Sequence, residues 1–150
     1  MGAEEFAHCA RRELAWYRDT YPELRGGVEI RDDIHGNFVL RNTLLVGKRV
    51  RVPLSRVDAL IQHEVGTHLV TYANGCAQPL RQLATGLAGY EELQEGLAVL
   101  AEYLAGGLTS SRLRVIAARV VAVKHMTEGK SFVDTFRLLK ERYQFDARLA

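Results

Sequence analysis

Two histidines five residues apart, His63 and His68, constrain the fold of this chain more than any other feature. With Glu64 beside them they resemble a helical metal-binding pattern, whose common version has histidines four residues apart on one helix face. At about 100° per residue, positions five apart are offset by roughly 140°. In a regular helix Thr67, rather than His68, would therefore share the face of His63. Both rings can meet one metal only if the helix takes up an extra residue, as a π-bulge does, and Gly66 would ease that distortion. The spacing predicts a widened helical turn between His63 and His68.

A downstream acidic cluster offers a third metal ligand. Catalytic zinc usually takes three protein ligands from His and Asp or Glu and leaves the fourth position open. Glu95 is the best candidate, because its helix can return across the first one and the small Gly96 and Ala98 permit a close approach. Glu91 and Glu102 share its helix face and could orient the imidazoles. The simpler interpretation places Glu91 at a helix N-terminus and Glu102 in solvent. For the histidines themselves, the alternative interpretation is that they have no common function and that Glu64 is a solvated glutamate beside them.

Hydrophobic periodicity predicts a helix, a short strand region and further helices. We expect the first helix over residues 4–21 and three or four short antiparallel strands between residues 28 and 53. The helices expected after them cover residues 55–72, 91–105, 110–127 and 131–139. The fold class is therefore α+β, mostly helical, with a small antiparallel sheet before the helix that carries the two histidines.

Composition and charge exclude several classes of protein. The 150 residues include 20 Lys and Arg and 18 Asp and Glu, a net charge of +2 with no basic block, so we expect no nucleic-acid partner. No apolar stretch approaches the roughly 20 residues of a membrane span, and residues 1–14 do not form a secretory signal. Cys9 and Cys76 lie far apart, as suits a reducing compartment. We expect a cytoplasmic domain that binds no membrane, with its oligomeric state open.

Several motifs occur together in this order: HEVGTH at residues 63–68, NG at 74–75, QP at 78–79 and EELQEGLA at 91–98. This combination resembles the bacterial QEGLA-motif family, which is related to the eukaryotic microtubule-associated tyrosine carboxypeptidases. The resemblance is strongest over about residues 28–145. Gln94 stands where the eukaryotic motif has an acid, which leaves a ligand set with Glu95 unaffected.

The resemblance implies a zincin-like zinc metallopeptidase, of carboxypeptidase type, with one zinc ion per chain. In that reading His63, His68 and Glu95 are the zinc ligands, and Glu64 is the acid/base that activates a zinc-bound water. The substrate is then the C-terminus of a peptide or protein. Family members continue beyond the position of Ala150, so residues 1–150 are expected to be a single catalytic core, either excised or from a short homologue.

The residues that contact substrate stay open. Tyr72, Tyr90 and His125 are candidates for stabilising an oxyanion, although packing or surface roles are simpler interpretations. Arg119 lies on a helix that is apolar nearly all round, so we expect it to be buried against a glutamate. The other arginines open to a substrate carboxylate are Arg49, Arg51 and Arg56. An exposed edge strand within residues 28–53 could pair with an extended peptide.

Two other functions remain open. One is a regulatory or binding protein that retains a zinc site without peptidase activity. The other is an amidase that applies the same chemistry to a different bond. Glu64 favours an enzyme, because a purely structural site has no need of a base beside its ligands.

Overall fold

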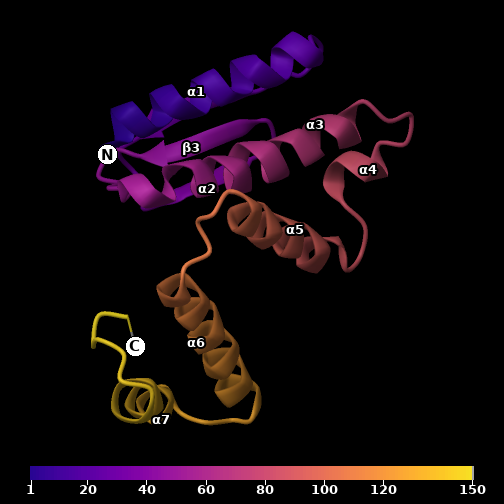
Figure 1. Cartoon of the computed structure of the whole chain (residues 1–150). Coiled ribbons are helices and arrows are strands. Elements are labelled where there is room, and N and C mark those ends of the chain that lie inside the picture. Colours follow the sequence, from indigo (N-terminus) through magenta and orange to yellow (C-terminus); the bar gives the residue numbers. More distant parts are fainter. Residues whose placement is uncertain (150) are drawn as a thin grey trace. The chain divides into compact units, whose positions relative to one another are not determined.

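The computed structural model describes residues 1–149 and divides into two compact units, Met1–Leu108 and Thr109–Ala150, which are described separately. Within residues 1–149, no helix combines the length and apolar composition that a membrane span requires. Figure 1 shows the elements of the first unit in chain order. They are α1 (Ala3–Thr20), β1 (Gly27–Arg31), β2 (Asn37–Leu40), β3 (Thr43–Gly47), the 3₁₀ turn η1 (Leu54–Arg56), α2 (Val57–Ile61), the π-helix η2 (Gln62–Leu69), α3 (Val70–Cys76), α4 (Gln82–Thr85) and α5 (Tyr90–Leu104).

Helix α1 forms where the sequence predicted the first helix. Phe6, Ala10 and Leu14 recur at four-residue intervals and are buried, which gives the helix one apolar face against the sheet and α2. At its start, the backbone N–H of Gly2 donates to the carboxylate of Glu5 at 2.8 Å. This face packs into the same hydrophobic core as Val65 and Leu69, which lie close to the two histidines in the sequence.

The sheet is mixed, which corrects the expectation of an antiparallel one. Its strand order is β1-β3-β2. Strand β3 pairs antiparallel with β2 and parallel with β1, with Gly27 opposite Thr43 in the parallel pair. The physical reason is burial: Leu44, Leu45 and Val46 of β3 are all buried, and such a continuous apolar run is stable at the centre of a sheet. Strand β1 therefore pairs with β3 rather than with β2.

A fourth strand does not form in the segment before the helix that carries His63 and His68. This helix, which runs from η1 through α2 and η2 to α3, is called the histidine helix below. Arg51 makes an isolated bridge with Gly2, and Val52 donates its N–H to the carbonyl oxygen of Met1. The segment thus ties the start of α1 to the sheet without extending the sheet. Strand β2 remains an edge strand.

The histidine helix is continuous from η1 to α3 and extends beyond the predicted residue 72. Gly75 lies inside α3. A Cβ atom added at Gly75 would lie 2.3 Å from the carbonyl oxygen of Leu83, so glycine at this position allows α4 to approach α3. The short α4 lies in the segment between the helices predicted over residues 55–72 and 91–105.

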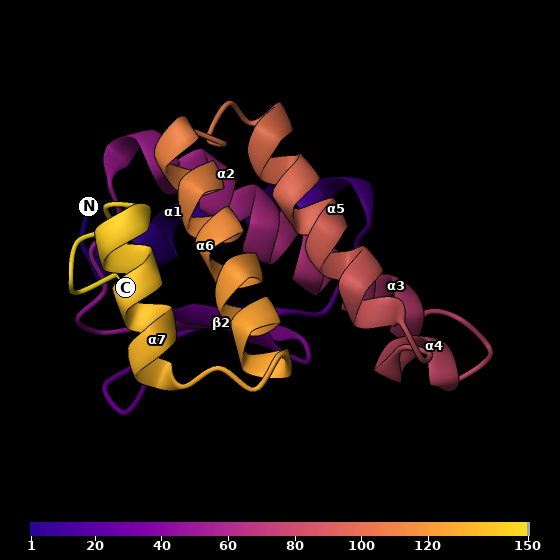
Figure 2. The same ribbon diagram turned by 90° about the horizontal axis from the view of Figure 1, so that it is seen from below.

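Helix α5 packs against α2 and η2, and Figure 2 shows α5 and α2 side by side. Ala98 is fully buried in α5, as expected for a close approach between the helices. Gly96 is not needed for this approach, because a Cβ atom added there would meet no atom within 4 Å. Close packing of α5 is what brings the acidic cluster to the histidines.

The second unit consists of α6 (Ser110–Thr127), α7 (Phe132–Arg137) and the π-helix η3 (Leu138–Arg142). Thr109 caps α6 and Ser131 forms a capping box with Asp134, close to the predicted helix starts. No residue of α6 is buried, and Arg119 is exposed. The expectation of a buried Arg119 was wrong, because apolar residues all round a helix do not by themselves supply a partner surface.

Candidate metal centre

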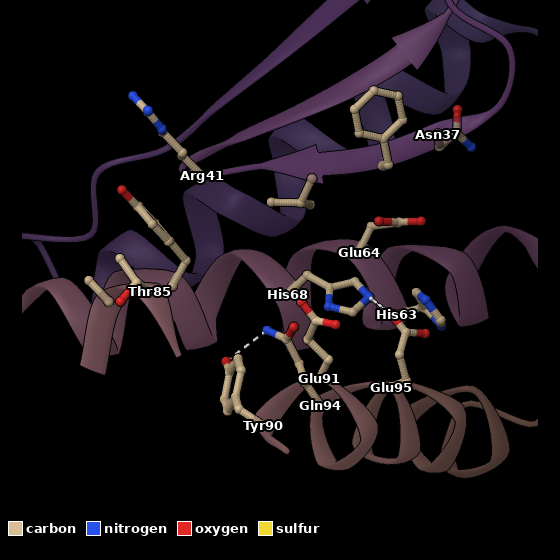
Figure 3. Close-up of a pocket in the computed structure, with 14 residues that line it drawn as sticks. Asn37, Arg41, His63, Glu64, His68, Thr85, Tyr90, Glu91, Gln94 and Glu95 are labelled. Carbon is tan, nitrogen blue, oxygen red and sulfur yellow. Dashed lines mark hydrogen bonds and ion pairs between the residues drawn. The ribbon is translucent and has the colours of Figure 1, made fainter. Parts of the chain in front are cut away.

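The predicted widened turn between the histidines is confirmed. Residues Gln62–Leu69 form a π-helix, and the imidazoles of His63 and His68 lie with ring centroids 4.9 Å apart at an interplanar angle of 73°. Thr67, which a regular helix would place beside His63, is buried and donates its hydroxyl to the carbonyl oxygen of Gln62 at 3.0 Å. The π-helix therefore takes up the extra residue and directs both rings to one side (Figure 3).

Gly66 has a packing role within this turn. A Cβ atom added there would lie 2.5 Å from Oε1 of Gln62 and 3.1 Å from the hydroxyl oxygen of Tyr17. The side chain of Gln62 donates to Oε1 of Glu13 at 2.6 Å, so it links the widened turn to α1. Glycine at this position lets α1 support the turn at close range.

Three side-chain contacts fix the register between the histidine helix and α5. Nε2 of His68 lies 3.5 Å from Oε1 of Glu95, and Nδ1 of His63 lies 2.9 Å from Oε1 of Glu102. Seven residues before His63, Nη2 of Arg56 lies 2.8 Å from Oε2 of Glu102. Positions decrease along one helix while they increase along the other, so the two helices run antiparallel.

Glu102 corrects the expectation of a solvated side chain. It is fully buried and contacts both His63 and Arg56. The sequence held a usable signal for this cluster: Arg56 precedes His63 by seven residues and Glu102 follows Glu95 by seven, so each pair shares a helix face.

His63, His68 and Glu95 form a group that could hold a metal ion, with one ligand atom of each within 4.8 Å of the others. Two imidazoles and a carboxylate are a donor set typical of catalytic zinc. Burial, followed by the neighbouring His68, lowers the pKa of His63 and so favours the neutral form that binds metals. The side chain of Glu95 is 63% exposed, so the group is open on one side. The residues present fit a metal ion with an open coordination position.

Glu64 lies on a different side of the helix from the two rings. Figure 3 shows it extending toward β2, whereas both histidines face α5 and Glu95. Burial, with smaller contributions from Glu95 and Glu102, raises the pKa of Glu64 to about 8. A carboxyl group with a pKa in this range can take up and release protons near neutral pH.

A cavity of about 530 Å³ joins these side chains. The π-helix forms its floor, and Asn37, Phe38 and Val39 of the edge strand β2 form one wall. Residues of α4 and α5 form the opposite wall. There Tyr90 packs over Gly86 and accepts a hydrogen bond from Nε2 of Gln94 at 2.9 Å. The cavity thus places the possible metal ligands beside an exposed strand.

The structure separates the remaining candidates. Tyr72 and Tyr90 both line the cavity, whereas His125 belongs to the second unit and lies 3.4 Å from the hydroxyl of Thr135. Arg56 is occupied by Glu102, while Arg49 and Arg51 do not line the cavity. The arginine at its rim is Arg41, in the β2–β3 turn, which no sequence motif marks. Figure 3 shows its side chain pointing away from the histidines.

Comparison with known proteins adds a family assignment. A family model described as microtubule-associated tyrosine carboxypeptidase matches residues 1–150. No curated protein and no solved structure shows significant similarity to the chain. The family match thus covers the segment in which the sequence motifs resemble that family and extends through α1.

Proposed function

The chain belongs to the microtubule-associated tyrosine carboxypeptidase family, and from this premise we propose that it is a zinc-dependent metallopeptidase of carboxypeptidase type. The grouping of His63, His68 and Glu95 beside the buried Glu64 carries the proposal. A purely structural metal site has no use for a buried carboxyl group that opens to the same cavity. We also propose that the chain has a zincin-like catalytic core, as the resemblance of its motifs implies.

We assign the metal to His63, His68 and Glu95, one zinc ion per chain. When bound, zinc lowers the pKa of water and polarises a carbonyl group. The neutral imidazoles and single carboxylate leave such a site with net positive charge. The exposed side of Glu95 leaves room for substrate.

Glu64 is the proposed acid/base. Its carboxylate accepts a proton from the attacking water, whose oxygen adds to the carbon of the scissile peptide bond. The carboxyl group then delivers the proton to the leaving amine nitrogen as the carbon–nitrogen bond breaks. Burial of Glu64 supports this role, because it keeps bulk water from competing for the proton.

The cavity wall suggests how a peptide binds. Strand β2 is at the edge of the sheet and lines the cavity through Asn37, Phe38 and Val39. An extended peptide can pair with such an edge by β-augmentation, which would present its backbone carbonyls to the metal group. The family description leads us to propose a C-terminal tyrosine as the residue released.

Glu64→Gln tests the catalytic part of the proposal. The zinc-loaded chain is incubated with a short peptide ending in tyrosine, and free tyrosine is measured by mass spectrometry. We expect the wild-type chain to release tyrosine. We expect Glu64→Gln to retain zinc and to lower turnover by at least about 100-fold, the typical contribution of one proton-transferring group.

Two matched substrates separate the alternatives. The same peptide with an amidated C-terminus should resist a carboxypeptidase but not an endopeptidase, and internal fragments would identify the latter. Unchanged turnover in Glu64→Gln would remove Glu64 from the mechanism. Stoichiometric zinc without hydrolysis of any peptide in a library would favour the regulatory or binding protein over the enzyme.

A further inference from the structure

A buried ion pair lies directly behind the proposed metal group. Glu102 is fully buried, and the side chain of Arg56 is 15% exposed. Burying two charges costs several kcal/mol per ion before their attraction is counted, and apolar side chains of similar size often stabilise a fold as well. Stability alone therefore gives little reason for this pair.

The two carboxylate oxygens of Glu102 serve different partners. Oε2 lies 2.8 Å from Nη2 of Arg56, and Oε1 lies 2.9 Å from Nδ1 of His63. Arg56 is itself fixed, because its Nη1 donates to the carbonyl oxygen of Gly107 at the end of α5. The carboxylate is thus held from behind while one oxygen faces the ring.

Gly107 fits closely at this anchor point. It is buried, and a Cβ atom added there would lie 2.2 Å from Cβ of Ala59 in α2. The backbone after α5 therefore lies tightly against α2, where its carbonyl group can meet Arg56. The backbone of Gly107, Arg56 of η1 and Glu102 of α5 thus form a chain of contacts that ends at the imidazole of His63.

We propose that Glu102 is a positioning residue for the metal site. Oε2 of its carboxylate is held by Arg56, and Oε1 lies 2.9 Å from Nδ1 of His63, a buried nitrogen with no aligned acceptor in this structure. A small rotation of the ring lets Oε1 accept the Nδ1–H, which presents Nε2 of the ring to the metal. This inference rests on the proposed function, since it assigns a role toward the same metal. Carboxylate partners of this kind fix the orientation and tautomer of a ligating histidine, and their loss typically weakens metal binding 10–100-fold.

Glu102→Gln tests the role directly. In glutamine an NH2 group, which donates, replaces one of the two carboxylate oxygens, so either Arg56 or His63 then faces a group that cannot accept its N–H. We expect the zinc dissociation constant, measured by chelator competition, to rise about 10–100-fold. We also expect a change in the ¹⁵N chemical shifts of the His63 ring in the metal-free protein. The wild-type ring should have one tautomer, protonated at Nδ1, whereas the variant should have a mixture of both tautomers. Glu92→Gln, an exposed glutamate on the same helix, is the matched control and should change neither quantity.

A second variant covers the risk that an unpaired Arg56 unfolds the chain. Arg56→Gln/Glu102→Gln removes both charges, retains hydrogen-bonding groups and should preserve the circular dichroism spectrum. It should still weaken zinc binding at least about 10-fold. Wild-type zinc affinity within twofold, with an unchanged tautomer, in both variants would overturn the positioning role alone. A wild-type chain that binds no zinc would overturn the proposed function together with this inference.

Discussion

Three glutamates surround the two histidines, and their surroundings give each a different chemistry. Glu64 is buried, and its pKa is raised to about 8, mainly by that burial. Glu95 is largely exposed and reaches His68 from α5. Glu102 is fully buried but paired with Arg56. The same side chain thus serves as proposed base, proposed ligand and proposed support, according to burial and partner.

Glu95→Ala tests which glutamate completes the metal group. We expect zinc measured by atomic absorption to fall from one ion per chain to well below stoichiometric, because a carboxylate ligand is lost. Glu91→Ala is the control, since Glu91 lines the same cavity from the same helix but lies outside the metal group. Full zinc content in Glu95→Ala, or loss of zinc in Glu91→Ala alone, would contradict the ligand assignment.

At the scale of elements, glycines mark where one segment must approach another. Gly66 lies beside Tyr17 of α1, Gly75 beside the backbone of α4, and Gly107 beside Ala59 of α2. Gly96 has open space where its side chain would be, although it lies within the motif of α5. The first three glycines allow neighbouring segments to pack closely against the histidine helix, whereas Gly96 could be replaced by alanine without a steric clash.

The same substitution should therefore have opposite effects in two helices. Gly75→Ala places a Cβ atom 2.3 Å from the carbonyl oxygen of Leu83 and should lower the free energy of unfolding by about 1–3 kcal/mol. Gly96→Ala should raise it by about 0.4–1 kcal/mol, because alanine restricts the unfolded chain and meets no atom. Urea titration followed by circular dichroism measures both. A destabilised Gly96→Ala would show that this face of α5 has a role that the contacts of residues 1–149 do not reveal.

At the scale of the whole molecule, the first unit carries the site and most of the core. Among residues 1–149, all buried apolar side chains except Leu139 lie in Met1–Leu108. The metal group and its cavity lie there too. The first unit therefore contains both the packing that supports the histidine helix and the helix that supplies Glu95.

A chain ending at Leu108 should therefore retain zinc binding. We expect one zinc ion per chain and a cooperative thermal transition. Zinc present at 100 times its dissociation constant should add about 2.7 kcal/mol to the free energy of unfolding. The comparison is the full chain under the same conditions. If the shortened chain is unfolded, residues from Thr109 onward complete one core, as the sequence interpretation of a single catalytic core predicts.

Much of the fold and of the site could be predicted from local spacing. Helix periodicity located α1 and α5, and the five-residue spacing of His63 and His68 predicted the π-helix, because helix geometry depends on neighbours a few residues apart. The need for a third ligand, and the small residues beside Glu95 in its predicted helix, led to Glu95, which the structure brings to His68.

Contacts between distant segments required the tertiary structure. The parallel pairing of β1 with β3, the burial of Glu102 against Arg56, and the place of Arg41 at the cavity rim depend on which elements pack together. Sequence patterns record which face of an element is apolar but not which partner covers it. The sequence by itself determined that two histidines and a glutamate would share a widened turn. Only tertiary packing decided that a second glutamate, 39 positions beyond His63, would lie buried behind that histidine.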